Sequence, residues 1–292
     1  MTAVFALATS LLWGLADFGG GLLTRRIPAL TVVVVSQTIA AGVLGAIVLA
    51  TGAWSEAGPR LWFAVAAGIA GPAAMLAFYR ALALGPMGVV SPLASIGVVV
   101  PLGAGLTLGE RPGAMQAAGI LVAVAGVLLA GGPELRGAPV QRQAIIYALV
   151  AAFGFGAVMA LIAEASTTLN GLFLALFVQR LANTAVGGGA LYISVRRGGQ
   201  ALPRPADGTS GTTVIRAALP ALAFVGLADV AANGTYAIAA QLGPVTVAAV
   251  LASLYPVVTA VAARGLLKER LKAVQAVGAG LALVGTTLLA AG

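Results

Sequence analysis

The sequence contains neither cysteine nor histidine in its 292 residues. The first absence excludes disulfides, a thiol nucleophile and cysteine metal sites, and the second excludes an imidazole base and histidine metal ligands. Charged residues make up only 8% of the chain, whereas soluble globular domains carry about 25%. So few charges cannot cover a water-facing surface, and disordered, collagen-like and coiled-coil chains need far more polar or periodic sequence. All of these classes are therefore excluded.

Apolar residues make up 60% of the chain, and the mean hydropathy is +1.05. A helix needs about 20 apolar residues to cross a bilayer. Ten such spans are predicted, over residues 2–22, 28–51, 61–83, 86–107, 113–131, 144–163, 171–195, 217–241, 244–264 and 273–291. No basic residue precedes the first span, which favours a retained helix over a cleaved signal peptide. The predicted fold class is an all-α integral membrane protein.

The net charge of +8 arises from 16 basic and 8 acidic residues. Most basic residues lie in short gaps between apolar runs, as expected of membrane loops, so no nucleic-acid partner is predicted. Twelve of them fall in odd-numbered connections, and only Arg60 and Arg111 fall in even-numbered ones. The longest connection, Arg196 to Arg216, is predicted to be a surface loop. The count places the odd connections in the cytoplasm and both termini outside.

Short motifs recur in the two halves of the chain at nearly constant offsets. At an offset of 158, Gly85-Pro86 and Leu93-Ala94-Ser95 recur as Gly243-Pro244 and Leu251-Ala252-Ser253. One inserted residue later, Glu110-Arg111 recurs as Glu269-Arg270. At an offset of 142, Trp13-Gly14 aligns with Phe155-Gly156, and Gln37 aligns with Gln179. This ordered series of matches indicates an internal repeat.

Each half holds five predicted spans, an odd number, so the second copy must insert upside down relative to the first. We expect a first repeat over residues 1–132, a connecting loop over 133–143 and a second repeat over 144–292, around a central cavity. Inverted repeats are a recurrent device of secondary transporters, which bind substrate near mid-membrane at the repeat interface. The repeat therefore predicts transport by alternating access.

The motifs that recur also resemble a known family. The run from Tyr79 to Pro86, followed by Ser91-Pro92-Leu93 and Gly109-Glu110-Arg111, resembles the EamA repeat of the drug/metabolite transporter superfamily. Within this superfamily the chain is most similar to the YddG-type bacterial aromatic amino-acid exporters. The resemblance implies amino-acid export across a bacterial inner membrane. It also implies cytoplasmic termini, contrary to the basic-residue count.

Two sets of repeated residues have alternative interpretations. Glu110-Arg111 and Glu269-Arg270 follow spans four and nine, and each is either a gate latch or an ion pair at a helix end; we favour the helix end. Glycines recur every two turns on spans five and ten, at Gly119, Gly126, Gly278 and Gly285. Small residues at this spacing allow helices to approach closely, either inside the chain or at a dimer interface.

Ionisable residues inside membrane spans are costly and therefore indicate function. Asp229, Asn233 and Tyr236 lie on one face of span eight, and Trp13 and Asp17 form a shorter stripe on span one. Arg180 is expected either to pair with an acid or to meet a substrate carboxylate. Arg80 lies near a span end, where its side chain can extend to the interface.

A zwitterionic amino acid needs an acceptor for its ammonium group, donors for its carboxylate and an apolar wall for its side chain. Asp17 or Asp229 supplies the first, and Asn233, Ser95 or Ser253 supplies the second. Aromatic faces attract an ammonium group as well. The candidate wall consists of Trp13, Phe78, Tyr79, Phe155 and Tyr236; the alternative is that these rings simply fill the bundle.

The leading hypothesis is a secondary transporter that exports small metabolites, chiefly amino acids including aromatic ones. The alternative is a multidrug, nucleotide or sugar transporter of the same superfamily. A membrane-embedded enzyme is disfavoured because the sequence offers no nucleophile with a base and no metal cluster. The sequence also contains no P-loop motif, so ATP-driven transport is not indicated. No cofactor or metal is expected. The expected partners are a small-molecule substrate and the lipid bilayer, with a monomer favoured over a dimer. Coupling to a proton through Asp17 or Asp229 and passive, gradient-driven export are alternatives that the sequence leaves open.

Overall fold

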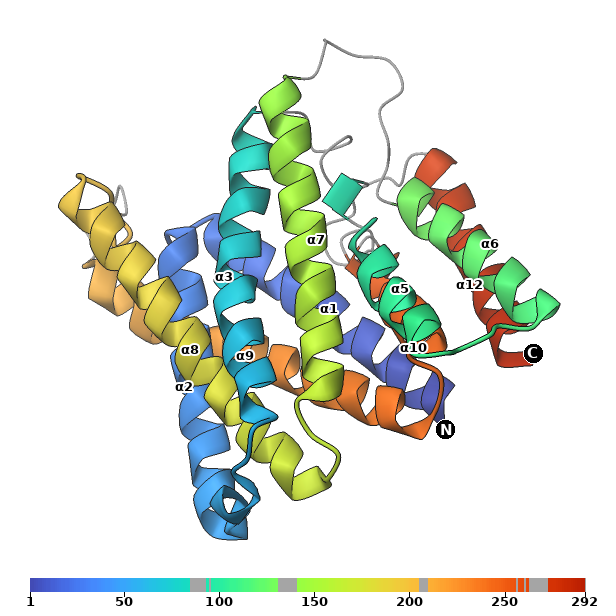
Figure 1. Ribbon diagram of the computed structural model, residues 1–292. Coiled ribbons are helices and arrows are strands. Elements are labelled where there is room, and N and C mark those ends of the chain that lie inside the picture. The colour runs from blue at the N-terminus through green and yellow to red at the C-terminus, as the bar shows by residue number, and fades with distance from the viewer. Residues whose placement is uncertain are drawn as a thin grey trace.

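The computed structural model describes residues 1–84, 93–94, 96–130, 141–204, 210–255, 257–259, 261–262 and 273–291. Every regular element within these ranges is a helix (Figure 1). The elements are α1 (Thr2–Thr24), α2 (Ala29–Thr51), η1 (Ala53–Glu56), α3 (Leu61–Leu84), η2 (Ile96–Val98), α5 (Val99–Thr107), α6 (Ala114–Ala130), α7 (Arg142–Glu164), α8 (Leu169–Arg196), α9 (Gly211–Leu242), α10 (Val245–Ala252) and α12 (Ala273–Ala291).

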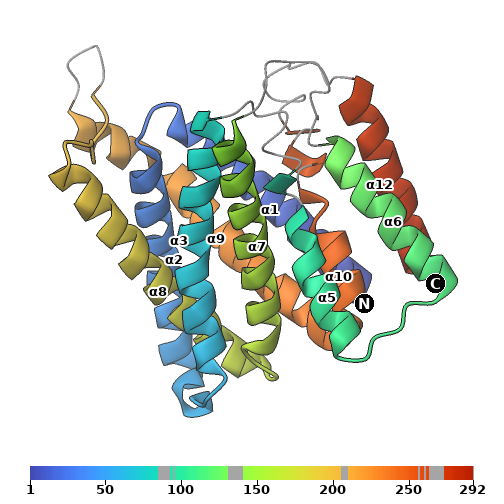
Figure 2. The same ribbon diagram turned by 45° about the horizontal axis from the view of Figure 1, so that its top comes forward.

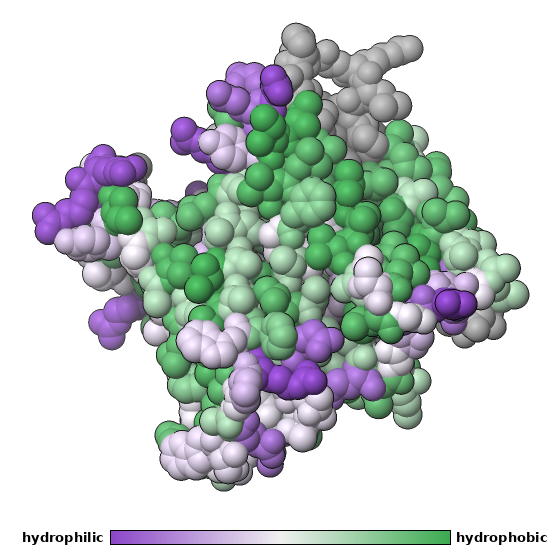
Figure 3. All heavy atoms as spheres, in the orientation of Figure 1, coloured by the Kyte–Doolittle hydropathy of each residue, from purple (hydrophilic) through white to green (hydrophobic). Residues whose placement is uncertain are grey.

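Six helices are long and apolar enough to cross a membrane, namely α1, α2, α3, α7, α8 and α9. Four shorter apolar helices accompany them, over Ile96–Thr107, Ala114–Leu129, Val245–Thr259 and Ala276–Leu289. The predicted spans 86–107 and 244–264 lie only partly within the described residues. Figure 3 shows hydrophobic side chains over the middle of the molecule and hydrophilic ones toward its ends. This distribution fits a chain that passes several times through a bilayer.

The predicted loop from Arg196 to Arg216 begins where expected but ends earlier, because α9 starts within it. Helix α8 continues to Arg196, and Gly198 follows with a left-handed φ of 86° that ends the helix. Helix α9 begins at Gly211, so Arg216 lies in its second turn rather than in a loop. A helix at a membrane surface can extend into water, because its backbone hydrogen bonds do not depend on the apolar run that marks the span.

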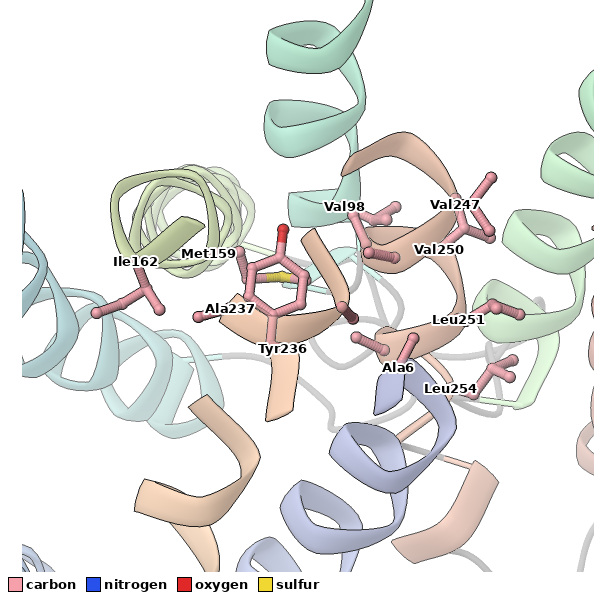
Figure 4. Packing of buried hydrophobic residues seen from close by; sticks show 14 of the residues in the cluster. Ala6, Val98, Met159, Ile162, Tyr236, Ala237, Val247, Val250, Leu251 and Leu254 are labelled. Atoms are coloured by element: carbon pink, nitrogen blue, oxygen red, sulfur yellow. The ribbon is translucent and has the colours of Figure 1, made fainter. Parts of the chain in front are cut away.

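The main helix contacts join the two halves of the chain. Helix α1 packs on α9, α3 on α7, α2 on α8, and α6 on α12 (Figures 1 and 2). Each of these pairs therefore combines one helix from residues 1–132 with one from residues 142–291. The largest buried apolar cluster lies where α1, η2, α7, α9 and α10 meet (Figure 4).

Glycines line the contact between α6 and α12. Added Cβ atoms at Gly119 and Gly126 would meet Leu289 and Ala282 of α12, and one at Gly285 would meet Ala123 of α6. At Gly126 this Cβ would lie only 2.7 Å from the Ala282 Cα. The predicted close helix packing is confirmed, and these glycines are used inside the chain rather than presented as a dimer face.

Candidate functional site

A polar cluster surrounds the Asp229 carboxylate, where α1, α2, α8 and α9 face one another. The Oδ1 atom accepts hydrogen bonds from Trp13 Nε1 at 3.1 Å and from Asn233 Nδ2 at 3.2 Å. The Oδ2 atom accepts from Gln37 Nε2 at 3.0 Å and from Arg180 Nη1 at 2.6 Å. Four donors thus converge on one carboxylate, and the bond from the Arg180 guanidinium is a charge-assisted one.

Arg180 is the most buried member of this cluster, with 1% of its surface exposed. Besides its ion pair with Asp229, its Nη1 donates to Gln37 Oε1 and its Nη2 donates to Gln179 Oε1 at 3.2 Å. The expectation that Arg180 pairs with an acid is confirmed. Its Nε–H, however, is buried and has no acceptor within the described part of the chain. The guanidinium is therefore neutralised by Asp229 but retains one free donor.

Asp17 differs from Asp229 in being exposed rather than partly buried, and in its partners. On α1 it lies between Trp13, which bonds to Asp229, and Gly20, where an added Cβ would lie 3.9 Å from Val225 of α9. This face of α1 therefore looks toward α9. Asp17 interacts electrostatically with Asp229 and with Tyr255, yet it makes no hydrogen bond or ion pair to any described residue. It presents an accessible, unpartnered carboxylate inside the bundle.

Aromatic rings adjoin the two carboxylates. The Trp13 ring centroid lies 6.1 Å from Tyr236 and 6.1 Å from Tyr255, the second in an edge-to-face arrangement. Phe78 and Phe155 form another edge-to-face pair, also 6.1 Å apart. By the sequence offsets, Phe155 corresponds to Trp13 and Phe78 to Tyr236. The two ring pairs therefore occupy corresponding positions in the two halves.

The remaining predicted residues do not join the cluster. Ser253 is buried, and its hydroxyl donates to the Val250 carbonyl of its own helix at 2.8 Å. Ser95 and the side chain of Tyr79 lie outside the described residues. Arg80 is exposed, as expected for a side chain that reaches the interface.

Three cluster residues were absent from the predicted set: Gln37, Gln179 and Tyr255. The match of Gln37 with Gln179 between the halves was the signal that could have identified the glutamines. Both amides contact Arg180, one from α2 and one from α8 itself. Tyr255 carries no comparable signal.

A separate crevice of about 400 Å³ opens at one end of the bundle, between η1 and the turn that joins α7 to α8. Its walls include Glu56, Arg60, Ser166 and Thr168. Arg60 pairs with Glu164 across this crevice at 3.3 Å, and both side chains are about half exposed. No predicted site residue lines it. The described residues also contain no group of three or more carboxylates that would hold a metal ion.

Comparison with known proteins agrees with this architecture. A solved structure named "Crystal structure of protein" superimposes on this chain with a TM-score of 0.71 and is 20% identical to it in sequence. The match covers 98% of this chain and 95% of that one, and at this identity it supports the fold alone. A Sinorhizobium sp. protein named "uncharacterized transporter in cobO 3′ region" is 41% identical over 92 residues, which span 30% of this chain and 65% of that relative. The sequence profile of the EamA-like transporter family matches residues 1–132 and 142–291. The chain therefore belongs to the EamA-like transporter family.

Proposed function

We propose that the protein is a secondary transporter that exports amino acids, including aromatic ones, across a bacterial inner membrane by alternating access. One observation carries the proposal: Asp17 is an exposed carboxylate without a partner among the described residues, one helical turn from Trp13, and it interacts electrostatically with Tyr255. A carboxylate next to aromatic faces suits an ammonium group, which both attract. A charge within a membrane span is costly, so its presence indicates a binding role.

The architecture that we propose is two inverted repeats of five helices, over residues 1–132 and 144–292, with residues 133–143 as the connecting loop. The helix pairs that join the halves support it, since α1 on α9 corresponds to α7 on α3. The double match of the family profile and the corresponding ring pairs support it as well. In such transporters the substrate binds between the repeats.

Within this site we assign the substrate ammonium to Asp17 rather than to Asp229. Each carboxylate oxygen of Asp229 already accepts two hydrogen bonds, and the one from Arg180 to Oδ2 is 2.6 Å long. An ammonium group there would have to displace existing donors, whereas Asp17 has none to displace. Asp17 is also the group at which a proton would compete with the substrate, so it is our candidate for proton coupling.

The substrate carboxylate is assigned to Arg180 through its free Nε–H. This donor is buried without an acceptor, and a buried unpaired donor costs about 1–3 kcal/mol. A substrate carboxylate that accepts this N–H would remove that cost. The apolar part of the substrate then contacts Trp13 and Tyr255, whereas Tyr236 is buried behind Trp13.

Other substrates of the same superfamily fit the charges less well. A nucleotide or phosphorylated sugar favours several converging cationic groups. Within the described residues Arg180 is already paired with Asp229, and Arg80 is exposed at the end of α3. We therefore place drugs, sugars and nucleotides second. The basic-residue count supports an orientation with both termini outside.

Counterflow in proteoliposomes tests the proposal. Liposomes that hold purified protein are preloaded with one unlabelled amino acid at a time, and uptake of labelled phenylalanine is followed. We expect transient accumulation with amino-acid preloads, aromatic ones above all. If folded protein shows no accumulation with any preload, the amino-acid assignment is wrong, and drugs, sugars and nucleotides become the substrates to test.

The substitution Asp17→Asn tests whether Asp17 binds the substrate ammonium group. We expect Asp17→Asn to raise the KM for phenylalanine by about tenfold or more, because the ammonium loses a charged acceptor worth roughly 1.5–3 kcal/mol. Glu164→Gln makes the same chemical change in an exposed pair at the end of the bundle and should leave KM unchanged. An unchanged KM in the Asp17→Asn protein would show that the ammonium group does not bind at Asp17.

A further inference from the structure

Glu110 connects the two halves of the molecule. It follows α5 in the first half, yet its Oε1 accepts the Val245 N–H at 2.5 Å and its Oε2 accepts the Thr246 N–H at 3.0 Å. Val245 and Thr246 are the first residues of α10, in the second half. The carboxylate thus caps the N-terminus of a helix about 135 residues away in the chain. No described contact pairs it with its neighbour Arg111.

The chain is built to place Glu110 in this position. Gly109 adopts a left-handed φ of 96°, and the Glu110 N–H returns to the Gly105 carbonyl at 3.0 Å, which reverses the chain at the end of α5. Gly105 leaves the necessary space, because an added Cβ would lie 2.6 Å from Glu110 Oε2 and 2.7 Å from Thr246 Cγ2. Two glycines therefore serve one contact.

This contact stabilises an otherwise unfavourable helix end. The first N–H groups of a helix have no partner within the helix, and near lipid there is little water to replace one. Thr246 is 1% exposed. A carboxylate at this end satisfies two N–H groups and also interacts favourably with the helix dipole. Separating α5 from α10 leaves those groups unpaired.

We propose that Glu110 is a latch residue of the transport cycle: its carboxylate holds α5 against α10 while this end of the molecule is closed, and releases α10 when this end opens. The proposal rests on the transport function proposed above. Glu110 is a positioning residue here, since it acts on the gate and not on the substrate. Other contacts between the halves at this end, such as Arg60 with Glu164, are exposed and contribute little.

In the second half, the sequence around the residue that corresponds to Glu110 differs, in a segment that lies outside the described residues. Glu269 corresponds to Glu110, but Lys268 and Arg264 stand where the first half has Gly109 and Gly105. The proposal is therefore limited to Glu110, which favours the state closed at its own end.

Distance measurements between spin labels test the latch without any substrate. The chain has no cysteine, so Leu108→Cys and Leu242→Cys provide the only two labelling sites, both exposed and on either side of the contact. In proteoliposomes we expect one dominant short distance. Glu110→Gln replaces one acceptor oxygen with a donor, and should raise the ratio of long to short distances by about tenfold. Gly105→Ala keeps the carboxylate but displaces it, and should act in the same direction.

Glu164→Gln is the matched control, because it removes a carboxylate from an exposed contact between the halves at the same end. It should leave the distances unchanged. The latch is refuted if folded Glu110→Gln and Gly105→Ala proteins keep the distance distribution of the parent, or if Glu164→Gln shifts it equally. Since no substrate is needed, a failure of amino-acid counterflow is distinguishable from a failure of the latch.

Discussion

Arg180 is a charge that neither lipid nor a packed protein interior tolerates alone. Its ion pair with Asp229 is supported by amides from Gln37 and Gln179. The side chains differ in access: 2% of the Arg180 side chain is exposed, against 26% for Asp229. The arginine side of the ion pair is thus buried, whereas the carboxylate side is partly exposed. This arrangement leaves Asp17 as the acid of the site that has no hydrogen-bond partner among the described residues.

We expect Arg180→Ala to lower the melting temperature in detergent by about 10 °C, because removing one partner of a buried pair costs about 3–5 kcal/mol. Combining Arg180→Ala with Asp229→Asn should recover part of this loss, since no uncompensated charge then remains. Arg80→Ala, an exposed arginine, should be nearly neutral. Equal melting temperatures for Arg180→Ala and the parent protein would show that the pair does not stabilise the fold.

At the scale of elements, helix pairs depend on how closely two backbones approach. Helices α6 and α12 meet through Gly119, Gly126 and Gly285, where a Cβ has no room. Between apolar helices in lipid there is no hydrophobic driving force, so such contacts rest on close packing. The same closeness allows Glu110 to reach the first turn of α10 from another helix.

The glycines of α6 and α12 allow a matched comparison. Gly126→Ala should lower the melting temperature by several degrees, because its Cβ would lie 2.7 Å from the Ala282 Cα and would separate the helices. Gly280→Ala, in α12, meets nothing within 4 Å and should be neutral or stabilising by up to about 1 kcal/mol. Equal effects of the two substitutions would mean that the α6–α12 contact is not tightly packed.

At the scale of the whole molecule, the orientation in the membrane decides which end of the helix bundle faces the cytoplasm. The basic-residue count places the connection between α8 and α9 in the cytoplasm and the connection between α2 and α3 outside. The resemblance to the family implies the reverse. With both termini outside, the Glu110 latch would close the outer gate. With both termini in the cytoplasm, it would close the inner gate.

Cysteine labelling in intact cells distinguishes these orientations. With a membrane-impermeant thiol reagent, Ala57→Cys should react at once, and Gln200→Cys should react only after the cells are permeabilised. Both positions are exposed, and the chain has no other cysteine to react. The opposite pattern would place both termini in the cytoplasm and show that the basic-residue count is misleading here.

Much of the architecture follows from the sequence alone, because helix length, bilayer thickness and charge at the loops act locally along the chain. The six long apolar helices, the close packing of the glycines, and the shared face of Asp229 and Asn233 are all predictable in this way. The start of α9 at Gly211 was not, since polar residues can extend a helix beyond the membrane.

Only the tertiary structure decided which side chains meet. Asp17 and Asp229 look alike in the sequence. Among the described residues, however, Asp17 has no hydrogen-bond partner, whereas Asp229 accepts four hydrogen bonds. Glu110 reads as a helix-end residue, and its partners lie in the other half of the chain. The physical reason is that a sequence pattern shows which face of a helix is polar, whereas the rotation and crossing of packed helices determine what that face touches.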